Sequence, residues 1–329
     1  MKDFFEKVKN TNYGMNQKDI KTFDKTLDYI VADHSDKRKY KKSANLNNTH
    51  WGQLKLFISE LLFLTNYYDQ SEVSDVVYVG AAPGDHIPVL SMLFPKITFH
   101  LYDASEFRPQ VYNKEKIKIY NKYFDESDID EWKEKTCIFI SDIRTISYDS
   151  KKTKLVDIKN NEDIVWGDMN LQRRWVEEIK PLYSLLKFRL PYAEKFELEK
   201  GRTRKYLDGI VYIQPFCKAS SSESRLCVLG KQITEREWDI LEYEEKLFHH
   251  NSVRRDNHFY TNPIHIDQMH IYPELGLFND YDSVYFTHVV MDYMAKIRQP
   301  VNYKNIRKLL KIILEKITGD NMLLKFRDC

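Results

Sequence analysis

Short apolar segments alternate with longer amphipathic segments along the first two thirds of the chain. The apolar segments are rich in β-branched and aromatic residues, which is typical of strands buried on both faces of a sheet. The predicted strands cover residues 76–79, 97–102, 117–120, 137–143, 184–188, 209–213 and 225–229. Helical periodicity of the apolar residues predicts helices at residues 51–65, 86–94 and 166–182. The alternation predicts an α/β fold with a Rossmann-like sheet of seven strands.

The pattern on either side of this region is different. After residue 232 it becomes mostly helical, with helices predicted at residues 235–249, 282–297 and 303–317. The last helix carries a basic stripe, which is typical of a solvated surface, with a docking face for RNA or a partner protein as the alternative. Residues 1–50 are polar and basic, and the lysine-rich residues 146–163 are expected to form a loop. We therefore expect an N-terminal arm, a core and a helical extension packed on that core, over residues 1–50, 51–232 and 233–329.

Composition narrows the class of protein without identifying a function. Of the 329 residues, 42% are hydrophobic, enough for a substantial core, and a formal net charge of +2 does not by itself indicate a nucleic-acid-binding protein. Because the sequence has no signal segment and no run long enough to cross a bilayer, we expect a soluble, cytoplasmic protein. The cysteines are too scattered for a zinc motif, which predicts no bound metal and free buried thiols at Cys137, Cys217, Cys227 and Cys329.

The predicted strand at residues 76–79 ends in a glycine-rich turn. Gly80 and Gly84 bracket this turn, and such a turn lets the backbone approach a bound nucleotide-like molecule closely. Asp103 ends the next predicted strand, 103 − 80 = 23 residues beyond the first glycine, near the spacing of roughly 20 at which an acid meets ribose hydroxyls. The pattern indicates a nucleoside-bearing ligand. It is not Gly-x-Gly-x-x-Gly, which argues against a dehydrogenase.

Four ionisable residues fall at positions that face this end of the sheet. Asp142 lies at the end of the fourth predicted strand, Lys187 lies in the fifth, and Glu223 lies in a small-residue turn before the seventh. Lys55 lies at the edge of the apolar stripe of the first helix. Because the carboxyl ends of parallel strands meet at one edge of a sheet, we expect these side chains to converge there. Salt-bridged pairs with a purely structural role are the alternative.

Several motifs occur together in an order that one known family shares. They are Trp51-Gly-Gln-Leu-Lys-Leu56, Ser59-Glu-Leu-Leu-Phe-Leu64, Tyr78-Val-Gly-Ala-Ala-Pro-Gly-Asp-His86, Ile140-Ser-Asp-Ile-Arg144, Gln214-Pro-Phe216 and Ser222-Glu-Ser-Arg-Leu226. Together they resemble the poxvirus cap-specific mRNA nucleoside 2′-O-methyltransferases, a family that also serves as the small, processivity subunit of poly(A) polymerase. The resemblance runs from about residue 40 to residue 251 and points to a divergent relative from a large DNA virus.

The resemblance implies a catalytic group and a cofactor. The catalytic group is a Lys-Asp-Lys-Glu tetrad, which falls on Lys55, Asp142, Lys187 and Glu223. Lys187 is expected to be the general base, because burial, a second lysine and a sulfonium nearby all disfavour its charged form. The cofactor is S-adenosylmethionine, which becomes S-adenosylhomocysteine, and the matching positions are Gln53, Tyr78, Gly80, Gly84, His86 and Asp103.

The resemblance also implies a pocket for 7-methylguanosine, whose positive charge favours aromatic partners. Tyr40 and Tyr192 match the stacking pair, and Glu194 and Glu244 match the acids at the guanine edge. Ser220 departs from the family because a further aromatic residue lines the pocket there, which puts the strength and strictness of cap recognition in question. The arginines that adjoin the tetrad or the pocket are expected to meet RNA phosphates: Arg144, Arg189 and Arg225.

The expected function is therefore methyl transfer to the ribose 2′-hydroxyl of the first transcribed nucleotide of capped mRNA, in the host-cell cytoplasm, a viral factory or a virion. The expected partners are the capped mRNA 5′ end and, from the family's second role, the catalytic subunit of poly(A) polymerase. Two alternatives remain open. One is a cap-independent RNA 2′-O-methyltransferase with the same tetrad, and the other is a non-catalytic RNA-binding subunit of poly(A) polymerase.

Overall fold

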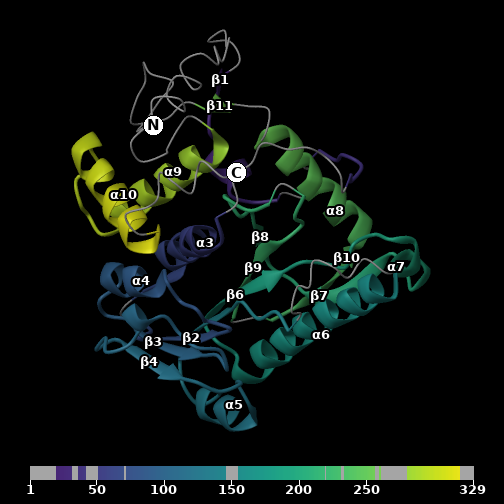
Figure 1. The fold of residues 1–329 in the computed structure, drawn as a ribbon, viewed down its shortest axis with the longest axis horizontal. Helices are drawn as coiled ribbons and strands as arrows, with labels where there is room; N and C mark the ends of the chain where they lie inside the picture. Colours follow the sequence, from purple (N-terminus) through teal and green to yellow (C-terminus); the bar gives the residue numbers. More distant parts are fainter. Residues whose placement is uncertain are drawn as a thin grey trace.

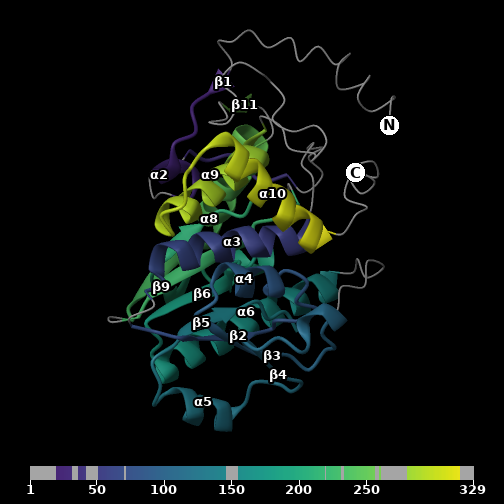
Figure 2. The same ribbon diagram turned by 90° about the vertical axis from the view of Figure 1, so that its left-hand side faces the viewer.

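The computed structural model of the chain is a sheet with helices on both faces (Figures 1 and 2). It describes residues 20–31, 36–41, 51–69, 72–145, 155–218, 220–230, 233–255, 259–260 and 280–318. The strands are β1 (Ile20–Lys21), β2 (Asp75–Val79), β3 (Thr98–Tyr102), β4 (Ile117–Tyr120), β5 (Ile138–Ser141), β6 (Tyr183–Phe188), β7 (Thr203–Leu207), β8 (Ile210–Tyr212), β9 (Ser224–Leu229), β10 (Glu235–Asp239) and β11 (Phe259–Tyr260). The α-helices are α2 (Lys25–Asp28), α3 (Gly52–Tyr67), α4 (Ile87–Leu93), α5 (Glu126–Trp132), α6 (Leu155–Ile179), α7 (Lys195–Glu199), α8 (Ile240–His249), α9 (Tyr281–Lys296) and α10 (Tyr303–Thr318).

The central sheet has seven strands in the order β4-β3-β2-β5-β6-β9-β8. The first five strands of this order are parallel, and β9 runs antiparallel to both of its neighbours. The chain builds the sheet outward from β2 in one direction and then returns to the other side of β2 with β5. In such doubly wound sheets, ligands bind beyond the carboxyl ends of the strands at this reversal point. The predicted seven-stranded, Rossmann-like α/β fold is confirmed.

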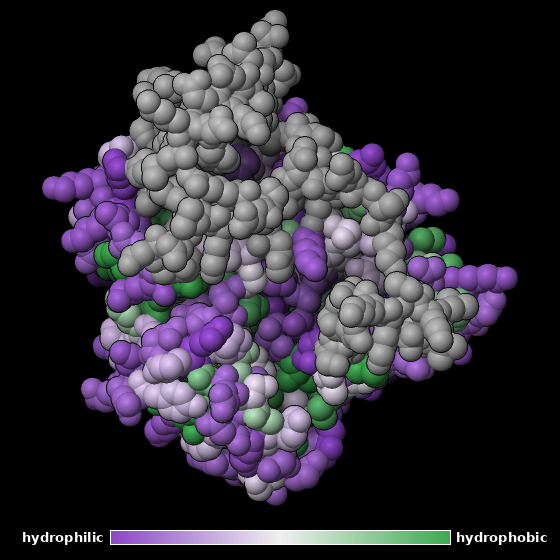
Figure 3. Space-filling view, in the orientation of Figure 1, coloured by the Kyte–Doolittle hydropathy of each residue, from purple (hydrophilic) through white to green (hydrophobic). Residues whose placement is uncertain are grey.

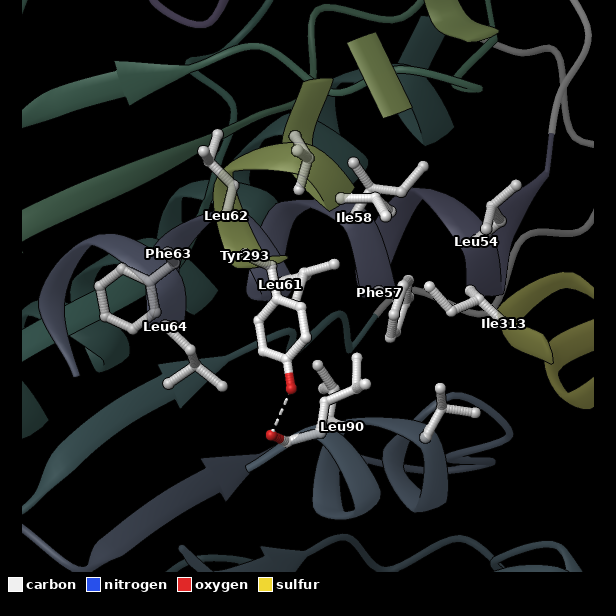
Figure 4. Packing of buried hydrophobic residues seen from close by; sticks show 14 of the residues in the cluster. Leu54, Phe57, Ile58, Leu61, Leu62, Phe63, Leu64, Leu90, Tyr293 and Ile313 are labelled. Carbon is white, nitrogen blue, oxygen red and sulfur yellow. Dashed lines mark hydrogen bonds between the residues drawn. The ribbon is translucent and has the colours of Figure 1, made fainter. Parts of the chain in front are cut away.

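Side chains of the sheet alternate between two hydrophobic cores. Val76 and Tyr78 of β2 belong to the core with α3, α4, α9 and α10, whereas Val77 and Val79 belong to the core with α5 and α6. Figure 4 shows part of the first core, in which residues of α3 pack with residues of α4, α9 and α10. The hydroxyl of Tyr293 in α9 donates to the carbonyl of Leu93 at 2.7 Å. The helix that carries Lys55 is therefore held by elements from both halves of the chain.

Two of the predicted segments have a different secondary structure from the one that we expected. Residues 235–239, predicted as the start of a helix, form β10, which pairs with β7 in an antiparallel ribbon. Trp238 of this ribbon is 5% exposed and packs in the second core, so aromatic burial decides the local structure here. Helix α6 begins at Leu155, so residues 155–163, predicted as part of a loop, are helical. Glu162, within this stretch, is buried.

The N-terminal segment follows the free edge of the sheet and then reaches α8. Val31 N–H donates to the carbonyl of Val211 in β8 at 2.9 Å, and Arg38 N–H donates to the carbonyl of Glu245 in α8 at 3.1 Å. Tyr40 lies two residues beyond that second contact. The segment thus brings Tyr40 to the end of the sheet at which β6 ends and Tyr192 lies.

In the part of the chain that the structure describes, the surface and the cysteines do not indicate a further site. The face of the molecule in Figure 3 is mostly hydrophilic, with hydrophobic residues in small separate groups. Within the described ranges, no helix is long and apolar enough to cross a membrane. Cys137, Cys217 and Cys227 are free and buried, and Cys329 lies outside the described residues.

Candidate active site

Lys55, Asp142, Lys187 and Glu223 come together beyond the carboxyl ends of β5 and β6. Asp142 directly follows β5, and Lys187 is the next-to-last residue of β6. Because β9 is antiparallel to β6, it begins at this edge, and Glu223 lies one residue ahead of it. Lys55 reaches the cluster from the first turn of α3. The sheet topology therefore explains why four residues spread over 168 positions share one site.

Ion pairs join these four side chains into one cluster. Lys55 Nζ lies 2.6 Å from Glu223 Oε1, and Lys187 Nζ lies 3.2 Å from Asp142 Oδ1 and 3.7 Å from Glu223 Oε2. The four side chains are between 12% and 16% exposed, so the cluster is largely shielded from water but still opens to the surface. Glu223 contacts both lysines and thereby fixes the two ammonium groups relative to each other.

Burial and neighbouring charges shift the ionisation of the cluster in opposite directions. Burial lowers the pKa of Lys187, and the attraction of Asp142 and Glu223 offsets this only in part. Burial would raise the pKa of both carboxyls, but the cations around them outweigh it and hold the pKa of Asp142 and of Glu223 below the usual range. The cluster thus combines ionised carboxylates with a lysine that releases its proton more readily than a free lysine does.

Arg225 is a further member of the cluster. Its side chain is 3% exposed, and its Nη2 lies 2.5 Å from Asp142 Oδ1 and 3.9 Å from Glu223 Oε1. The structure gives this arginine buried partners instead of the RNA phosphate that we expected. Its sequence signal is the spacing from Glu223, since residues i and i+2 of a strand point to the same face.

Gln214 completes the buried network around the two carboxylates. It is 1% exposed, and sequence reasoning used it only as part of a motif. With its amide nitrogen toward Glu223, it donates to Oε1 at 3.2 Å, and its oxygen accepts from Arg225 Nε at 2.8 Å. Gln214 therefore fixes Glu223 on the side opposite to Lys187's contact, through a hydrogen bond that carries no net charge.

Arg144 lies at the rim of the cluster. Its Nη2 is 3.7 Å from Glu223 Oε2 and its Nη1 is 3.9 Å from Asp168 Oδ2. Within the described part of the chain, Nη2 makes no hydrogen bond. Burial lowers the pKa of this guanidinium, although it stays charged at neutral pH. Arg144 Nη2 is therefore a buried donor that faces Glu223, not one that is open to an RNA phosphate.

The glycine-rich turn forms the other side of the site. Gly80 and Gly84 have φ angles of +79° and +75°, which side chains rarely adopt. A Cβ at Gly80 would lie 2.8 Å from the backbone nitrogen of Ile143 and 2.9 Å from the carbonyl carbon of Asp142. Asp103 holds the turn, because its Oδ2 accepts from Ala82 N–H at 3.0 Å. The turn thus packs closely against the backbone that follows β5, beside Asp142 of the cluster.

A buried chain of polar side chains links three of the predicted cofactor residues. Tyr78 hydroxyl donates to Glu60 Oε1 at 2.6 Å, and His86 Nε2 lies 2.9 Å from Glu60 Oε2. His86 Nδ1 lies 2.8 Å from Gln53 Oε1. Tyr78, His86 and Glu60 are each at most 2% exposed, so the Tyr78 hydroxyl faces Glu60 and not an open pocket. Sequence reasoning missed Glu60, whose signal is a carboxylate within the apolar stripe of a helix.

The residues predicted for cap binding meet at a second position on the same edge. The rings of Tyr40 and Tyr192 have centroids 5.5 Å apart and an angle of 34° between planes, which is direct contact. Tyr40 hydroxyl donates to the carbonyl of Ser220 at 3.0 Å, and its ring packs edge-on against Phe248. Where the resemblance implies an aromatic ring, this chain has Ser220, and the atom that contacts Tyr40 there is the backbone carbonyl of Ser220.

The two predicted acids of this pocket have different surroundings. Glu244 is 6% exposed, and burial together with the carboxylates of Glu194, Glu245 and Glu162 raises its pKa to about 7. Glu194 is exposed, just before α7. Only Glu244 is thus held in a shielded position where its charge depends on pH near neutrality.

Arg189 is buried beside Tyr192. It is 9% exposed and forms a paired set of hydrogen bonds with Glu162, at 3.0 to 3.2 Å. Its guanidinium lies 4.6 Å from the centre of the Tyr192 ring. As with Arg225, the structure gives this arginine buried partners in place of the RNA phosphate that we expected.

Comparison with known proteins now places the chain. Residues 22–318 match the family described as "Poly A polymerase regulatory subunit". The chain belongs to this family. Its relatives include the "Cap-specific mRNA (nucleoside-2'-O-)-methyltransferase" of myxoma virus (strain Lausanne), 29% identical over 244 residues that cover 68% of each chain. The protein with the same description from fowlpox virus (strain NVSL) is 26% identical over 302 residues, which cover 85% of this chain and 88% of that one. The poxvirus-type identity predicted from the motifs is confirmed.

Among solved structures, this family member is similar to bluetongue virus VP4, described as a multifunctional RNA-capping production line. The TM-score is 0.36 and the identity 13%, over 79% of this chain and 43% of that one. The chain therefore spans less than half the length of that protein. Among the residues that the structure describes, no group of three or more His, Cys, Asp or Glu side chains is arranged to hold a metal ion.

Proposed function

We propose that this family member is an S-adenosylmethionine-dependent mRNA 2′-O-methyltransferase that acts on the first transcribed nucleotide of capped mRNA. The observation that carries the proposal is the cluster in which Glu223 and Asp142 hold the ammonium groups of Lys55 and Lys187 at the ligand end of the sheet. The names of the myxoma and fowlpox virus relatives support the same reaction.

The reaction requires that a ribose hydroxyl lose its proton while its oxygen gains a methyl group. Bound S-adenosylmethionine would supply the methyl group from its positively charged sulfur, with S-adenosylhomocysteine as the product once the carbon–sulfur bond is broken and the bond to the 2′-oxygen is made. Lys187 Nζ takes the hydroxyl proton, because burial lowers its pKa and favours the neutral amine more than in a free lysine.

The other members of the cluster hold and balance charge. Lys55 lies beside the position of the reacting oxygen and stabilises negative charge that develops on it. Glu223 orients both lysines, and Asp142 orients Lys187 from the other side. Because Arg225 pairs with Asp142 at 2.5 Å, that carboxylate attracts Lys187 less strongly than an unpaired carboxylate does.

The cofactor is proposed to lie along the glycine-rich turn. Gly80 and Gly84 give the turn the backbone conformation along which it would lie, and Asp103 supplies a partly exposed carboxylate for ribose hydroxyls. Gln53 and His86 line the adjoining wall from α3 and the start of α4. Tyr78 contributes indirectly, through the hydroxyl bond to Glu60 that fixes the same wall.

The cap is proposed to bind between Tyr40 and Tyr192. A methylated guanine is a cation, and stacking on tyrosine rings selects it over unmodified guanine. Because the two rings are in contact, they must separate to admit a base. Glu244, in its ionised form, would accept the N–H groups of the guanine edge, and Arg144 would have to move from its position beside Glu223 to meet a phosphate between the cap and Lys187.

A second function, as the regulatory subunit of a poly(A) polymerase, is favoured by the family match over residues 22–318. The two functions do not exclude each other. A purely non-catalytic role would leave the Lys-Asp-Lys-Glu cluster as salt-bridged pairs with a structural role. The candidate surface for this role is the exposed basic stripe of α10, which includes Lys304, Lys308 and Lys311.

The decisive experiment is methyl transfer from radiolabelled S-adenosylmethionine to two matched short RNAs, one with a 7-methylguanosine cap and one without. Nuclease digestion then locates the label. Label on the 2′-oxygen of the first nucleotide of the capped RNA alone is the expected result. Label on both RNAs would instead indicate a cap-independent methyltransferase. No label on either RNA, with cofactor binding intact, would leave the regulatory-subunit function as the better explanation.

A further inference from the structure

The proposed catalytic lysine and the proposed cap-pocket ring lie on one short segment. Lys187 is near the end of β6, and Tyr192 follows it after 192 − 187 = 5 residues. Even fully extended, five residues span at most about 17 Å. The separation between a bound cap and the hydroxyl that reacts at Lys187 therefore depends on the course of residues 188–191.

Helix α6 holds this segment at both of its ends. Gln172 Nε2 donates to the carbonyl of Lys187 at 3.1 Å, and Glu162 Oε2 accepts from the backbone N–H of Tyr192 at 3.0 Å. Gln172 and Glu162 are 1% and 5% exposed, so both hydrogen bonds are shielded from water. One rigid helix thus fixes the position of the segment relative to the sheet.

Glu162 has a second contact at the cap end. Its two carboxylate oxygens accept three hydrogen bonds from the Arg189 guanidinium, at 3.0 to 3.2 Å. That guanidinium in turn lies against the Tyr192 ring. A single carboxylate therefore holds both the backbone of Tyr192 and the cation that contacts its ring.

We infer that Glu162 is a positioning residue that sets the distance between the cap pocket and Lys187, and so determines which nucleotide is methylated. The inference rests on the proposed function. Glu162 touches neither the reacting atoms nor the proposed cap position; it acts through Tyr192 and Arg189. When the charge of Glu162 is removed, the Tyr192 ring is no longer held in one position. The cap then binds more weakly, and the position of the reacting hydroxyl is less well defined.

The test compares Glu162→Gln with Asp163→Asn in the full-length protein. The two substitutions remove the same charge from adjacent residues of α6, but Asp163 is exposed and pairs only with Lys200 in the contacts we describe. For Glu162→Gln we expect the KM for capped RNA to rise by about tenfold, the loss typical of a charge-assisted hydrogen-bond set, while kcat changes much less. We also expect label on the second nucleotide, which Asp163→Asn should not produce.

Two further measurements separate positioning from folding. Glu162→Asp keeps the charge and should recover part of the KM and the preference for the first nucleotide. In an Arg189→Met background, the effect of Glu162→Gln on KM should shrink, because the two residues act through one contact.

Three outcomes would contradict the inference. Unchanged KM and unchanged label position in Glu162→Gln would remove Glu162 from this role. Equal losses on capped and uncapped RNA, with a lower thermal midpoint and no rescue by Glu162→Asp, would show that its role is only structural. If the wild-type protein itself labels no capped RNA, the proposed function fails, and the inference fails with it.

Discussion

The proposed catalytic cluster and the proposed cap pocket share one edge of the sheet but are built in opposite ways. The cluster joins side chains of α3, β6 and two strand ends through ion pairs of 2.6 to 3.7 Å. The pocket brings together an N-terminal segment, the loop after β6 and helix α8, and its two rings contact each other without a charged link. The first is fixed by the core, and the second by the meeting of separate surface elements.

This difference teaches where precision is needed. Proton transfer and methyl transfer tolerate little displacement, so their groups lie on strands and a buried helix. Recognition of a cap requires that two rings separate and close again, and Tyr40 belongs to the N-terminal segment whereas Tyr192 belongs to the segment held by α6. Mutations in the cluster should therefore act on kcat, and mutations in the pocket on KM and on cap dependence. The following predictions test that separation, from the largest effect to the smallest.

Lys187→Ala should give the largest effect. Removal of the proposed base should lower methyl transfer by about 100-fold to 10,000-fold, the usual contribution of a general base, while cofactor binding stays nearly intact. Radiolabel transfer and a cofactor-binding titration measure the two quantities. Lys133→Ala, which removes an exposed lysine paired with Asp130, is the control and should have no effect. Substantial turnover by Lys187→Ala would remove Lys187 from the base role.

Gly80→Ala should disturb both cofactor binding and the cluster. Its Cβ would lie 2.8 Å from Ile143 N at a φ of +79°, which costs about 1–3 kcal/mol of stability and displaces Asp142. We expect roughly tenfold to 100-fold slower methyl transfer and a lower thermal midpoint. Gly167→Ala in α6 is the matched control, because nothing lies within 4 Å of its Cβ and a helical alanine is favoured by about 1 kcal/mol. Equal behaviour of the two variants would contradict the close approach at Gly80.

Tyr192→Ala should act on recognition and not on chemistry. Loss of one stacking ring should weaken binding of a cap analogue by about 1–3 kcal/mol, with binding of uncapped RNA nearly unchanged. Fluorescence titrations with the cap analogue and with uncapped RNA measure both affinities. Tyr123→Ala, at a tyrosine that is 82% exposed, controls for the loss of an aromatic side chain. A parallel loss of both affinities would indicate a folding defect.

Glu244 should make cap binding depend on pH. Burial and neighbouring carboxylates raise its pKa to about 7, and a bound guanine edge with positive charge favours its ionised form. Affinity for a cap analogue should therefore rise with pH, by up to about tenfold between pH 6 and pH 8. Glu244→Gln should bind more weakly and lose this difference. Because the ligand's own titration affects both proteins equally, identical pH profiles would exclude Glu244 as the cause.

Local sequence patterns predicted much of the fold. The run that forms β2 is continuously apolar and ends in glycine, and such a strand has few alternatives. The strand β10 was not readable, because Glu235-Arg-Glu-Trp-Asp239 is extended only through its pairing with β7 and the burial of Trp238. A contact made across the structure leaves no periodicity within the segment itself.

For the candidate site too, the sequence predicted some features and not others. The tetrad positions could be expected at the ligand edge, because strand ends are visible in the sequence and parallel strands align them. The partners of Arg189 and Arg225 could not be, since sequence does not show whether an arginine points to a buried acid or to solvent. Glu162 was hidden within a lysine-rich stretch that we interpreted as a loop. Resemblance identified the residue types, and only the fold identified their partners.

The packing of α3 has a consequence for how the protein is made. The helix is among the first elements synthesised, yet part of its apolar face is covered by α9 and α10. Helix α3 ends at Tyr67 and α9 begins at Tyr281, so 281 − 67 = 214 residues separate them. At about 5–20 residues per second, that face waits roughly 10–40 seconds on the ribosome for its partners. The helix that carries Lys55 thus exposes part of its apolar face on the ribosome until α9 and α10 have been made.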